Sequence, residues 1–170
     1  FLNGSFRAEG EVSLSGARIG GQLECIGGRF CNAGGIALNA QNALVAGGTF
    51  LRSGFSAEGA VSLSGTQIGG QLACDGGSFH NSGSEALNAQ RLRVTEGFIW
   101  RAVTVADGAV NLASAHVGDL VDDLDSWPDA ANGLRLDGFT YDRISASFTD
   151  TPSRLDWLKR GTLWKGDFHP

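Results

Sequence analysis

Short bursts of alternating apolar residues recur along most of this chain. Alternation over only three to five residues predicts short β-strands, and the glycine pairs between the bursts predict tight turns with positive φ. No stretch in this part has the apolar spacing of an amphipathic helix, so the pattern favours an all-β fold and excludes helical solenoids. The bursts of the first unit are Val12-x-Leu14, Ile19, Leu23-x-Cys25 and Phe30, and its glycine pairs are Gly20-Gly21, Gly27-Gly28, Gly34-Gly35 and Gly47-Gly48.

The bursts belong to a repeat of 49 residues. Residues 6–49 align with residues 55–98 without a gap, and 27 of the 44 aligned positions are identical. A degraded third copy follows, in which residues 106–112 match residues 57–63. Each copy divides again, because residues 5–14 resemble residues 29–38. The elementary unit is therefore about 24–25 residues long and occurs roughly six times.

A unit of this length fits one coil of a parallel β-helix with three short strands and three turns. Stacked coils would place equivalent residues in ladders, with about 4.8 Å between rungs. We predict a single-stranded parallel β-helix, right-handed, in which residues one repeat apart lie two rungs apart. A β-propeller with 49-residue blades is the main alternative, but it needs longer strands than these. The predicted core ladders are Val12, Val61 and Val110; Leu14, Leu63 and Leu112; Ile19, Ile68 and Val117; and Leu23 with Leu72.

The chain divides into repeats over residues 1–145, as copies 6–54, 55–103 and a degraded 104–145, and a capping segment over residues 146–170. Twenty of the 26 glycines precede residue 99, and all four tryptophans follow it. The pattern Thr151-Pro152 followed by Lys159-Arg160-Gly161 predicts a short helix over about 152–160, with Thr151 as N-cap. We expect Leu155, Trp157 and Leu158 to cover the last coil. The regular period is expected to end at Tyr141.

The first six residues match residues 50–55, so the chain begins within a repeat. We expect a fragment of a longer protein with further coils upstream, and self-association through the unpaired strand edges of the solenoid.

Composition narrows the functions that the chain can have. A net charge of −5 without clustered Lys or Arg argues against nucleic acid as a partner. No apolar run is long enough to span a membrane. The three cysteines make neither a disulfide scaffold nor a metal set, and no Gly-rich motif lies between a strand and a helix, so no cofactor is predicted. Cys25 and Cys74 occupy equivalent repeat positions and are expected to be reduced core residues.

Candidate chemistry is sparse, and no catalytic residue is predicted. The acidic run from residue 119 to 132 is interpreted as a charged excursion, with a weak alternative as a Ca²⁺ site formed by Asp119, Asp122, Asp123 and Asp125. Other candidates are most simply structural or exposed residues: the stacked acids Glu9, Glu58 and Asp107; the amides Asn32, Asn39, Asn81 and Asn88, as ladders or αL residues; His80 and His116, in variable slots; and Arg52 with Arg101, which could bind an anion or a sugar.

The motif "GEVSLSGARIGGQLECIGG" and its second copy resemble a bacterial family of tandem repeats often labelled membrane-associated oxidoreductases or left uncharacterised. "SRLDWLKR" (153–160) and "FHP" (168–170) are similar to the junction after that family's repeats. More distantly, the coils are similar to pentapeptide-repeat and bactofilin β-helices. The resemblance implies a bacterial source and a place at the cytoplasmic face of the membrane, whereas the residues themselves fix no compartment. It assigns no catalytic residue.

Two functions follow as hypotheses. The first is a non-catalytic structural or interaction module within a larger protein, with a protein partner or a second copy bound at the solenoid edges. The second is a carbohydrate-binding or carbohydrate-active β-helix, with its site near the irregular coil at residues 98–130 and a glycan as ligand.

Overall fold

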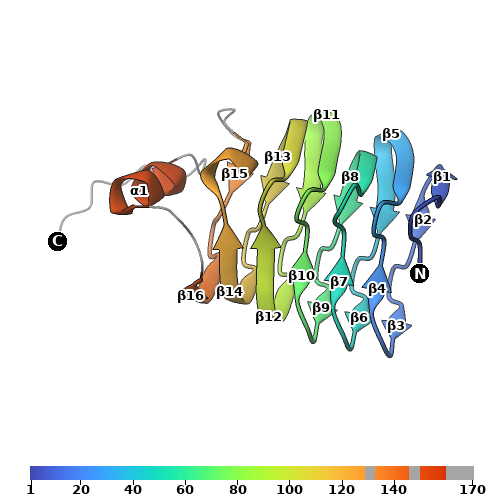
Figure 1. Ribbon diagram of the computed structural model, residues 1–170, viewed down its shortest axis with the longest axis horizontal. Helices are drawn as coiled ribbons and strands as arrows, with labels where there is room; N and C mark the ends of the chain where they lie inside the picture. Colours follow the sequence, from blue (N-terminus) through green and yellow to red (C-terminus); the bar gives the residue numbers. More distant parts are fainter. Residues whose placement is uncertain (129–132, 146–149, 160–170) are drawn as a thin grey trace.

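The chain winds into a stack of about six β-coils that is closed at one end by a short helix (Figure 1). The computed structural model describes residues 1–128, 133–145 and 150–159. Within this part, all strand pairs are parallel and form two sheets. The first sheet contains β1 (Arg7–Glu9), β2 (Val12–Ser13), β5 (Arg29–Asn39), β8 (Ser56–Ser62), β11 (Ser78–Asn88), β13 (Thr104–Asn111) and β15 (Leu134–Arg135). The second contains β3 (Arg18–Ile19), β4 (Leu23–Glu24), β6 (Leu44–Val45), β7 (Thr49–Phe50), β9 (Gln67–Ile68), β10 (Leu72–Ala73), β12 (Arg93–Trp100), β14 (His116–Asp122) and β16 (Thr140–Ile144).

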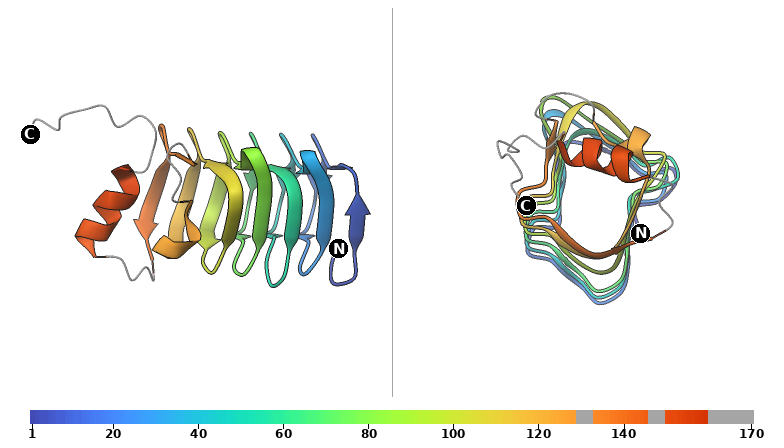
Figure 2. Two further views of the ribbon diagram at one scale, coloured as in Figure 1. Left: turned by 90° about the horizontal axis from the view of Figure 1, so that it is seen from above. Right: turned by 90° about the vertical axis from the view of Figure 1, so that its left-hand side faces the viewer.

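The predicted parallel β-helix is confirmed. Figures 1 and 2 show the strands on the upper side running from front to back while successive coils advance from right to left, which is a right-handed path. The end-on view in Figure 2 shows the coils superimposed around one shared interior. Each strand pairs with its equivalent in the neighbouring coils, and no barrel closes.

The coils alternate in length. The second sheet shows this in one ladder, where the register advances by 26, 23, 26, 23 and 24 residues through Arg18, Leu44, Gln67, Arg93, His116 and Thr140. The longer coils contain the 11-residue strands β5 and β11, and the shorter ones contain β8 and β13. Register shifts between Cys31 and Ile36, and between His80 and Leu87, mark where the extra residues bulge outward. One long and one short coil together make the 49-residue repeat.

The prediction of three strands per coil is wrong. Each of the first five coils offers four paired segments, two in each sheet, as β1, β2, β3 and β4 show for the first coil. In the long coils, the two segments of the first sheet form one continuous bulged strand, β5 or β11. The sequence therefore shows no turn between these two segments. Between the two sheets the chain turns at a corner where one residue takes a left-handed conformation. This corner residue is in turn Gly16, Asn42, Gly65, Arg91, Ser114 and Gly138, with φ between 54° and 68°.

Not all glycine pairs have the predicted role. Gly27 and Gly34 have positive φ, but Gly20 and Gly47 do not. Some glycines are instead needed because the backbone of a neighbouring coil lies very close to them. A Cβ atom on Gly69 would lie 2.3 Å from the carbonyl oxygen of Ala46 in the preceding coil. The glycine is therefore required there by the spacing between coils.

Aliphatic ladders fill the interior as the repeat predicts. One ladder runs through Val12, Leu38, Val61, Leu87, Val110 and Leu134, and a second runs through Ile19, Val45, Ile68, Val94, Val117 and Tyr141. The predicted core residues Leu23, Val61, Leu63, Ile68, Leu72, Val110, Leu112, Val117 and Trp157 are all buried. Val12, Leu14 and Ile19 belong to the first coil and are only partly buried, because no coil covers their outer side.

An aromatic column runs along the same axis. Its rings follow one another at centroid distances of 5.3 to 5.5 Å, within the range of favourable aromatic pairs. Phenylalanines build it in the regular coils, and tryptophans continue it where the repeat decays. The column consists of Phe6, Phe30, Phe55, Phe79, Trp100, Trp127 and Trp157. It therefore links the first coil to the capping helix.

The C-terminal end differs from the prediction in three details. The period does not end at Tyr141, since β16 continues pairing with β14 as far as Ile144. The capping helix α1 (Thr151–Lys159) is confirmed, but its N-cap is Asp150, whose carboxylate accepts a hydrogen bond from the Ser153 N–H at 2.8 Å. Leu155 is half exposed rather than packed.

The predicted contact of Leu158 lies outside the described side chains. No helix among the described residues is both long and apolar enough to cross a bilayer.

Candidate functional site

The described part of the acidic run, residues 119–128, is divided among three structural roles and does not form one ion site, whereas residues 129–132 lie outside the described residues. Its first residues are strand β14, not an excursion. Asp122 is buried and accepts hydrogen bonds from both guanidinium nitrogens of Arg154, at 2.8 and 2.7 Å, and from the Trp127 indole at 2.8 Å. Asp123 caps the 3₁₀ helix η1 (Leu124–Ser126) and also accepts from the Ala102 N–H. The side chains therefore hold the last coil and its cap together.

Asp119 lies apart from these, on the outer surface. It forms an ion pair with Arg143 and accepts a hydrogen bond from the Ser145 hydroxyl. The Arg143 hydrogen bond lowers the pKa of Asp119, so this carboxyl is an anion and not a proton donor near neutrality. Asp125 is exposed. Among the described residues, no group of three acidic, Cys or His side chains is arranged to hold a metal ion.

The predicted stack of acids is correct for two members only. Glu9 pairs in register with Cys31, and Cys31 with Glu58, so these two acids lie two rungs apart. The third rung position is not Asp107. Glu58 pairs with His80, and His80 with Ala106, because the register shifts by one residue in the third copy. Asp107 takes a left-handed conformation at that shift, with φ of 49°.

Within the part of the chain that the structure describes, the cysteines and histidines show no reactive arrangement. Burial raises the pKa of Cys25 to about 12 and raises the pKa of Cys74 well above its ordinary value, so both thiols stay protonated and inert. Cys25, Cys74 and Cys31 are all free. His80 contacts the Ala106 carbonyl through Nδ1 at 2.7 Å, and His116 contacts Thr140 and Asp142.

The predicted amide residues stabilise single coils. Asn32 and Asn81 donate to the carbonyl oxygens four residues later, and so close the bulges of β5 and β11. Asn39 and Asn88 accept from the backbone N–H two residues later, at the start of a corner. None of the four has positive φ. Asn39 also donates a hydrogen bond to the Glu11 side chain in the preceding coil.

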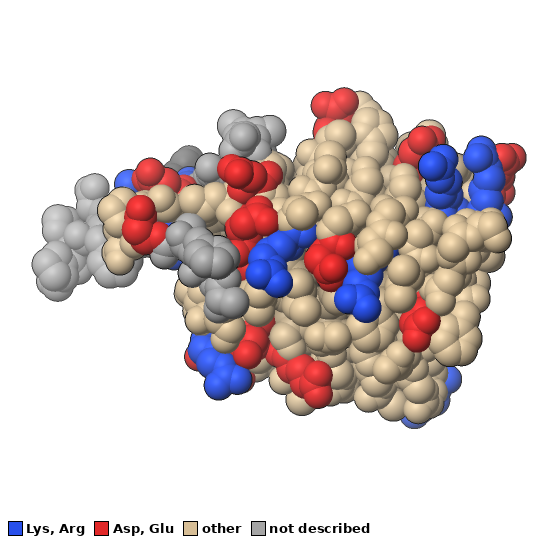
Figure 3. Space-filling view, viewed as in Figure 1, with Lys and Arg blue, Asp and Glu red and all other residues tan. Residues whose placement is uncertain are grey.

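Arg52 and Arg101 follow the strands β7 and β12 in the chain. On the face of the molecule shown in Figure 3, basic and acidic side chains are interspersed. The Ser53 N–H donates to the Asp75 carbonyl and the Gly76 N–H donates to the Arg101 carbonyl, so these charged residues lie close together in successive coils. The guanidinium of Arg52 lies 4.0 Å from Asp75 and 5.2 Å from the centre of the Phe50 ring. Its charge is thus compensated within the protein, which weakens the predicted anion site.

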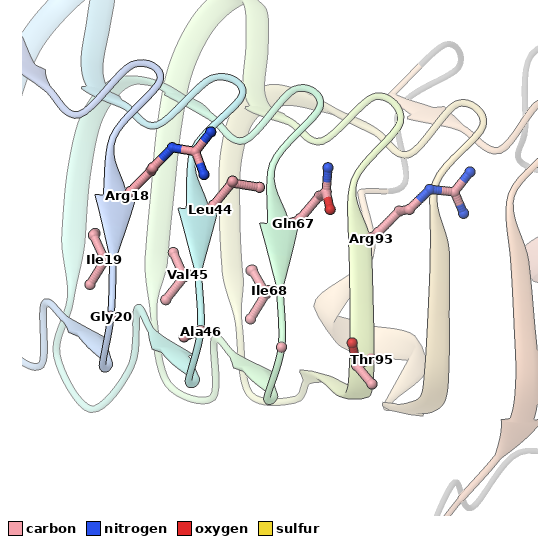
Figure 4. Close-up of a pocket in the computed structure, with 11 residues that line it drawn as sticks. Arg18, Ile19, Gly20, Leu44, Val45, Ala46, Gln67, Ile68, Arg93 and Thr95 are labelled. Atoms are coloured by element: carbon pink, nitrogen blue, oxygen red, sulfur yellow. The ribbon is translucent and has the colours of Figure 1, made fainter.

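Two hollows in the surface lie on the second sheet. One is a trough of about 480 Å³ that crosses β3, β6, β9 and β12 (Figure 4). Its upper row consists of Arg18, Leu44, Gln67 and Arg93, and its lower row of Gly20, Ala46, Gly69 and Thr95. Residues between the rows, Ile19, Val45 and Ile68, belong to a core ladder, so the trough floor there is backbone and small side chains.

The second hollow adjoins the trough at Thr95 and measures about 520 Å³. It lies across the middle of β12, β14 and β16 and is lined by Glu96, Asp119, Asp142 and Arg143. This hollow overlaps the region 98–130 proposed from the sequence only at Gly118 and Asp119. The trough lies earlier, on the regular coils.

Sequence reasoning missed the trough. The 49-residue alignment relates Arg18 to Gln67 and His116, and these differences identify a variable surface position. Leu44 and Arg93 lie in the same row because the long coils advance by 26 residues. An average unit of 24–25 residues therefore does not align them with Arg18 and Gln67.

Comparison with known proteins found no matching family model, no similar curated protein and no similar solved structure.

Proposed function

We propose that this chain is a non-catalytic β-solenoid scaffold that presents an interaction surface within a larger, bacterial, membrane-associated protein. The observation that carries the proposal is the uninterrupted core, in which the aromatic column joins every coil from Phe6 to Trp157. Rigid coupling of coils suits a spacer or a docking surface, since neighbouring repeats stabilise one another. The sequence resemblance supports the bacterial and membrane setting.

The side chains that could have done chemistry support the same proposal. The core thiols are protonated, and Asp122 and Asp123 hold structural contacts. General acid–base catalysis needs carboxylic groups placed around a bound substrate, with pKa values matched to donating and accepting protons. Asp119 instead has a lowered pKa through its ion pair with Arg143.

Native-state hydrogen exchange combined with an assay for polysaccharide cleavage tests the scaffold. We expect the strands from β5 to β14 to be protected to a similar degree, because the coils share one core. Incubation with a panel of neutral and anionic polysaccharides should release no shorter product. Coils that exchange independently would contradict the rigid scaffold, and release of shorter product would contradict the non-catalytic role.

The first coil supplies a partner surface for a second copy. Strands β1 to β3 pair with coils on one side only within the described residues, and Val12, Leu14 and Ile19 are partly exposed there. An unpaired strand edge beside apolar side chains favours pairing with another chain. Sedimentation velocity should show association that rises with concentration. Val12→Lys should weaken it, whereas Ser13→Lys, whose side chain already faces solvent, should not. A strictly monomeric protein at high concentration would contradict this surface.

Carbohydrate binding is the second candidate, and the two adjoining hollows on the second sheet favour it. Long open hollows on β-structure suit extended chains better than compact ligands. A glycan array with neutral and anionic members tests this candidate, and a folded protein that binds no member at millimolar concentration would refute it.

A further inference from the structure

The trough across β3, β6, β9 and β12 carries two arginines with no compensating charge. Arg18 and Arg93 are exposed, and neither has an ion pair or a side-chain hydrogen bond among the described residues. They occupy the same row and are separated by three rungs, which corresponds to about 14 Å along the axis. Figure 4 shows both guanidinium groups on the upper side of the trough, with Leu44 and Gln67 between them. Two anionic groups of one extended ligand could therefore be bound at once.

The floor of the trough restricts what kind of chain can lie there. The backbone groups of these strands already pair with the coils before and after, as in the bonds from Leu44 to Ala17 and from Gln67 to Ala43. A peptide laid across the sheet face cannot add a strand, because strand addition requires a free sheet edge. The ligand must therefore be recognised by its own charged and hydroxyl groups.

The charges around the trough also restrict the ligand. Among the described residues two arginines line it, and the hollow beyond Thr95 is lined by Glu96, Asp119 and Asp142, of which Asp119 is paired with Arg143. A nucleic acid carries a phosphate on every unit and needs many cations for binding. A polymer with weaker, more widely spaced anions, and with hydroxyl groups for Gln67, matches this surface better.

We propose that the trough binds a strand of acidic polysaccharide, lying along the solenoid axis with carboxylates at Arg18 and Arg93. Leu44 contacts the apolar face of a sugar ring, and the Gln67 amide bonds a ring hydroxyl. A pyranose unit is similar in length to one rung, so the strand crosses one coil per sugar. The small residues Gly20, Ala46 and Gly69 keep the floor open for it. This inference rests on the proposed role as a non-catalytic binding surface and names its ligand class.

The test uses the whole chain and oligomers of galacturonic acid in calorimetric titrations. A hexamer spans both arginines and should bind, whereas a dimer spans only one and should bind at least tenfold more weakly. Methyl esterification of the hexamer should abolish binding. Because a charged hydrogen bond contributes enough for about a tenfold change in affinity, Arg18→Gln and Arg93→Gln should each weaken binding about tenfold and the double variant about a hundredfold. Added salt should weaken it further.

Arg29→Gln is the matched control, since Arg29 is an exposed strand arginine on the other sheet. Its affinity for the hexamer should equal that of the unchanged chain. Equal binding of dimer and hexamer, or full binding by the double arginine variant, would overturn the proposal. Stronger binding of a poly-glutamate peptide or of single-stranded DNA than of the hexamer would do so as well. Binding followed by cleavage of the hexamer would keep this site but refute the non-catalytic role, and a folded protein that binds no hexamer would refute the site alone.

Discussion

The buried ion pair between α1 and the last coil allows the capping helix to be detached by one substitution. Asp122 is on β14 and has a fully buried side chain, whereas the Arg154 side chain on α1 is 12% exposed. The Arg154 guanidinium also lies 4.9 Å from the centre of the Trp157 ring, which ends the aromatic column. We predict that Arg154→Ala undocks α1 and leaves the coils folded.

The magnitude follows from the burial of the pair. Removing one partner of a buried, hydrogen-bonded ion pair destabilises the folded state by about 3–5 kcal/mol. If α1 undocks, Asp122 becomes exposed to water, and the destabilisation is then at the lower end of this range. Taking the lower value, about 3 kcal/mol, the population of undocked helix should rise by roughly a hundredfold. The coils keep their own ladders, so the unfolding transition of the β-helix should shift much less.

Hydrogen exchange of the amides in residues 150–159 measures this directly. Exchange there should be roughly a hundredfold faster in Arg154→Ala, by the free energy just given. Tryptophan fluorescence should shift to the red, because Trp157 becomes exposed to water. Lys159→Ala is the control on the same helix. Lys159 and Asp156 form an exposed pair, and such pairs contribute little.

A double variant separates the ion pair from simple packing. If the pair acts as a unit, Asp122→Asn combined with Arg154→Ala should cost less than the sum of the two single changes. Unchanged protection of residues 150–159 in Arg154→Ala would refute the reasoning. Strict additivity in the double variant would refute the coupling.

The remaining predictions concern the spacing between coils, the helix cap and the thiols. Gly69→Ala should lower the free energy of unfolding in urea by about 2 kcal/mol, because the added Cβ would collide with a carbonyl oxygen. Gly20 faces open space, so Gly20→Ala should lower it by less than about 0.5 kcal/mol. Equal losses in the two variants would contradict the contact at Gly69. The bond from the Ser153 N–H lowers the folded-state pKa of Asp150, so this stabilisation is present above the ordinary Asp pKa and is lost as pH falls through the folded value. Helicity of α1 should therefore decrease on acidification, and Asp150→Ala should lose that pH dependence. In the folded protein only Cys31 should react with an aromatic disulfide reagent at pH 8, since the other two thiols are buried and have raised pKa values; three fast-reacting thiols would contradict the core.

The sequence predicts the ladders well because each ladder is itself a periodic feature. Val12, Val61 and Val110 are spaced by the visible repeat, and the structure places Leu38 and Leu87 in the rungs between them. Position in the repeat alone therefore determines which residues face the core. The terminal helix was also predictable, because its signals at residues 151–161 are local, although the N-cap proved to be Asp150 and not Thr151.

Features that depend on the difference between coils could not be predicted. In the backbone register Phe30 pairs with Ala8 and not with Phe6, yet the rings of Phe6 and Phe30 lie 5.3 Å apart. The contact between Asp122 and Arg154 spans 32 residues and falls outside any period. An acidic run in the sequence indicates solvent exposure, so the burial of Asp122 requires knowledge of its partner.

The alternation of long and short coils has a consequence for how such a chain can grow. A bulged strand always stacks against unbulged neighbours, as β5 does against β1 and β8, and β11 against β8 and β13. Inserting or deleting a single coil would bring two bulges together or two plain strands together, and the ladder would lose its register. Genetic duplication or engineered lengthening therefore has to proceed in cassettes of two coils. The unit that can be duplicated is therefore one long coil together with one short coil, and the solenoid would lengthen in steps of 49 residues.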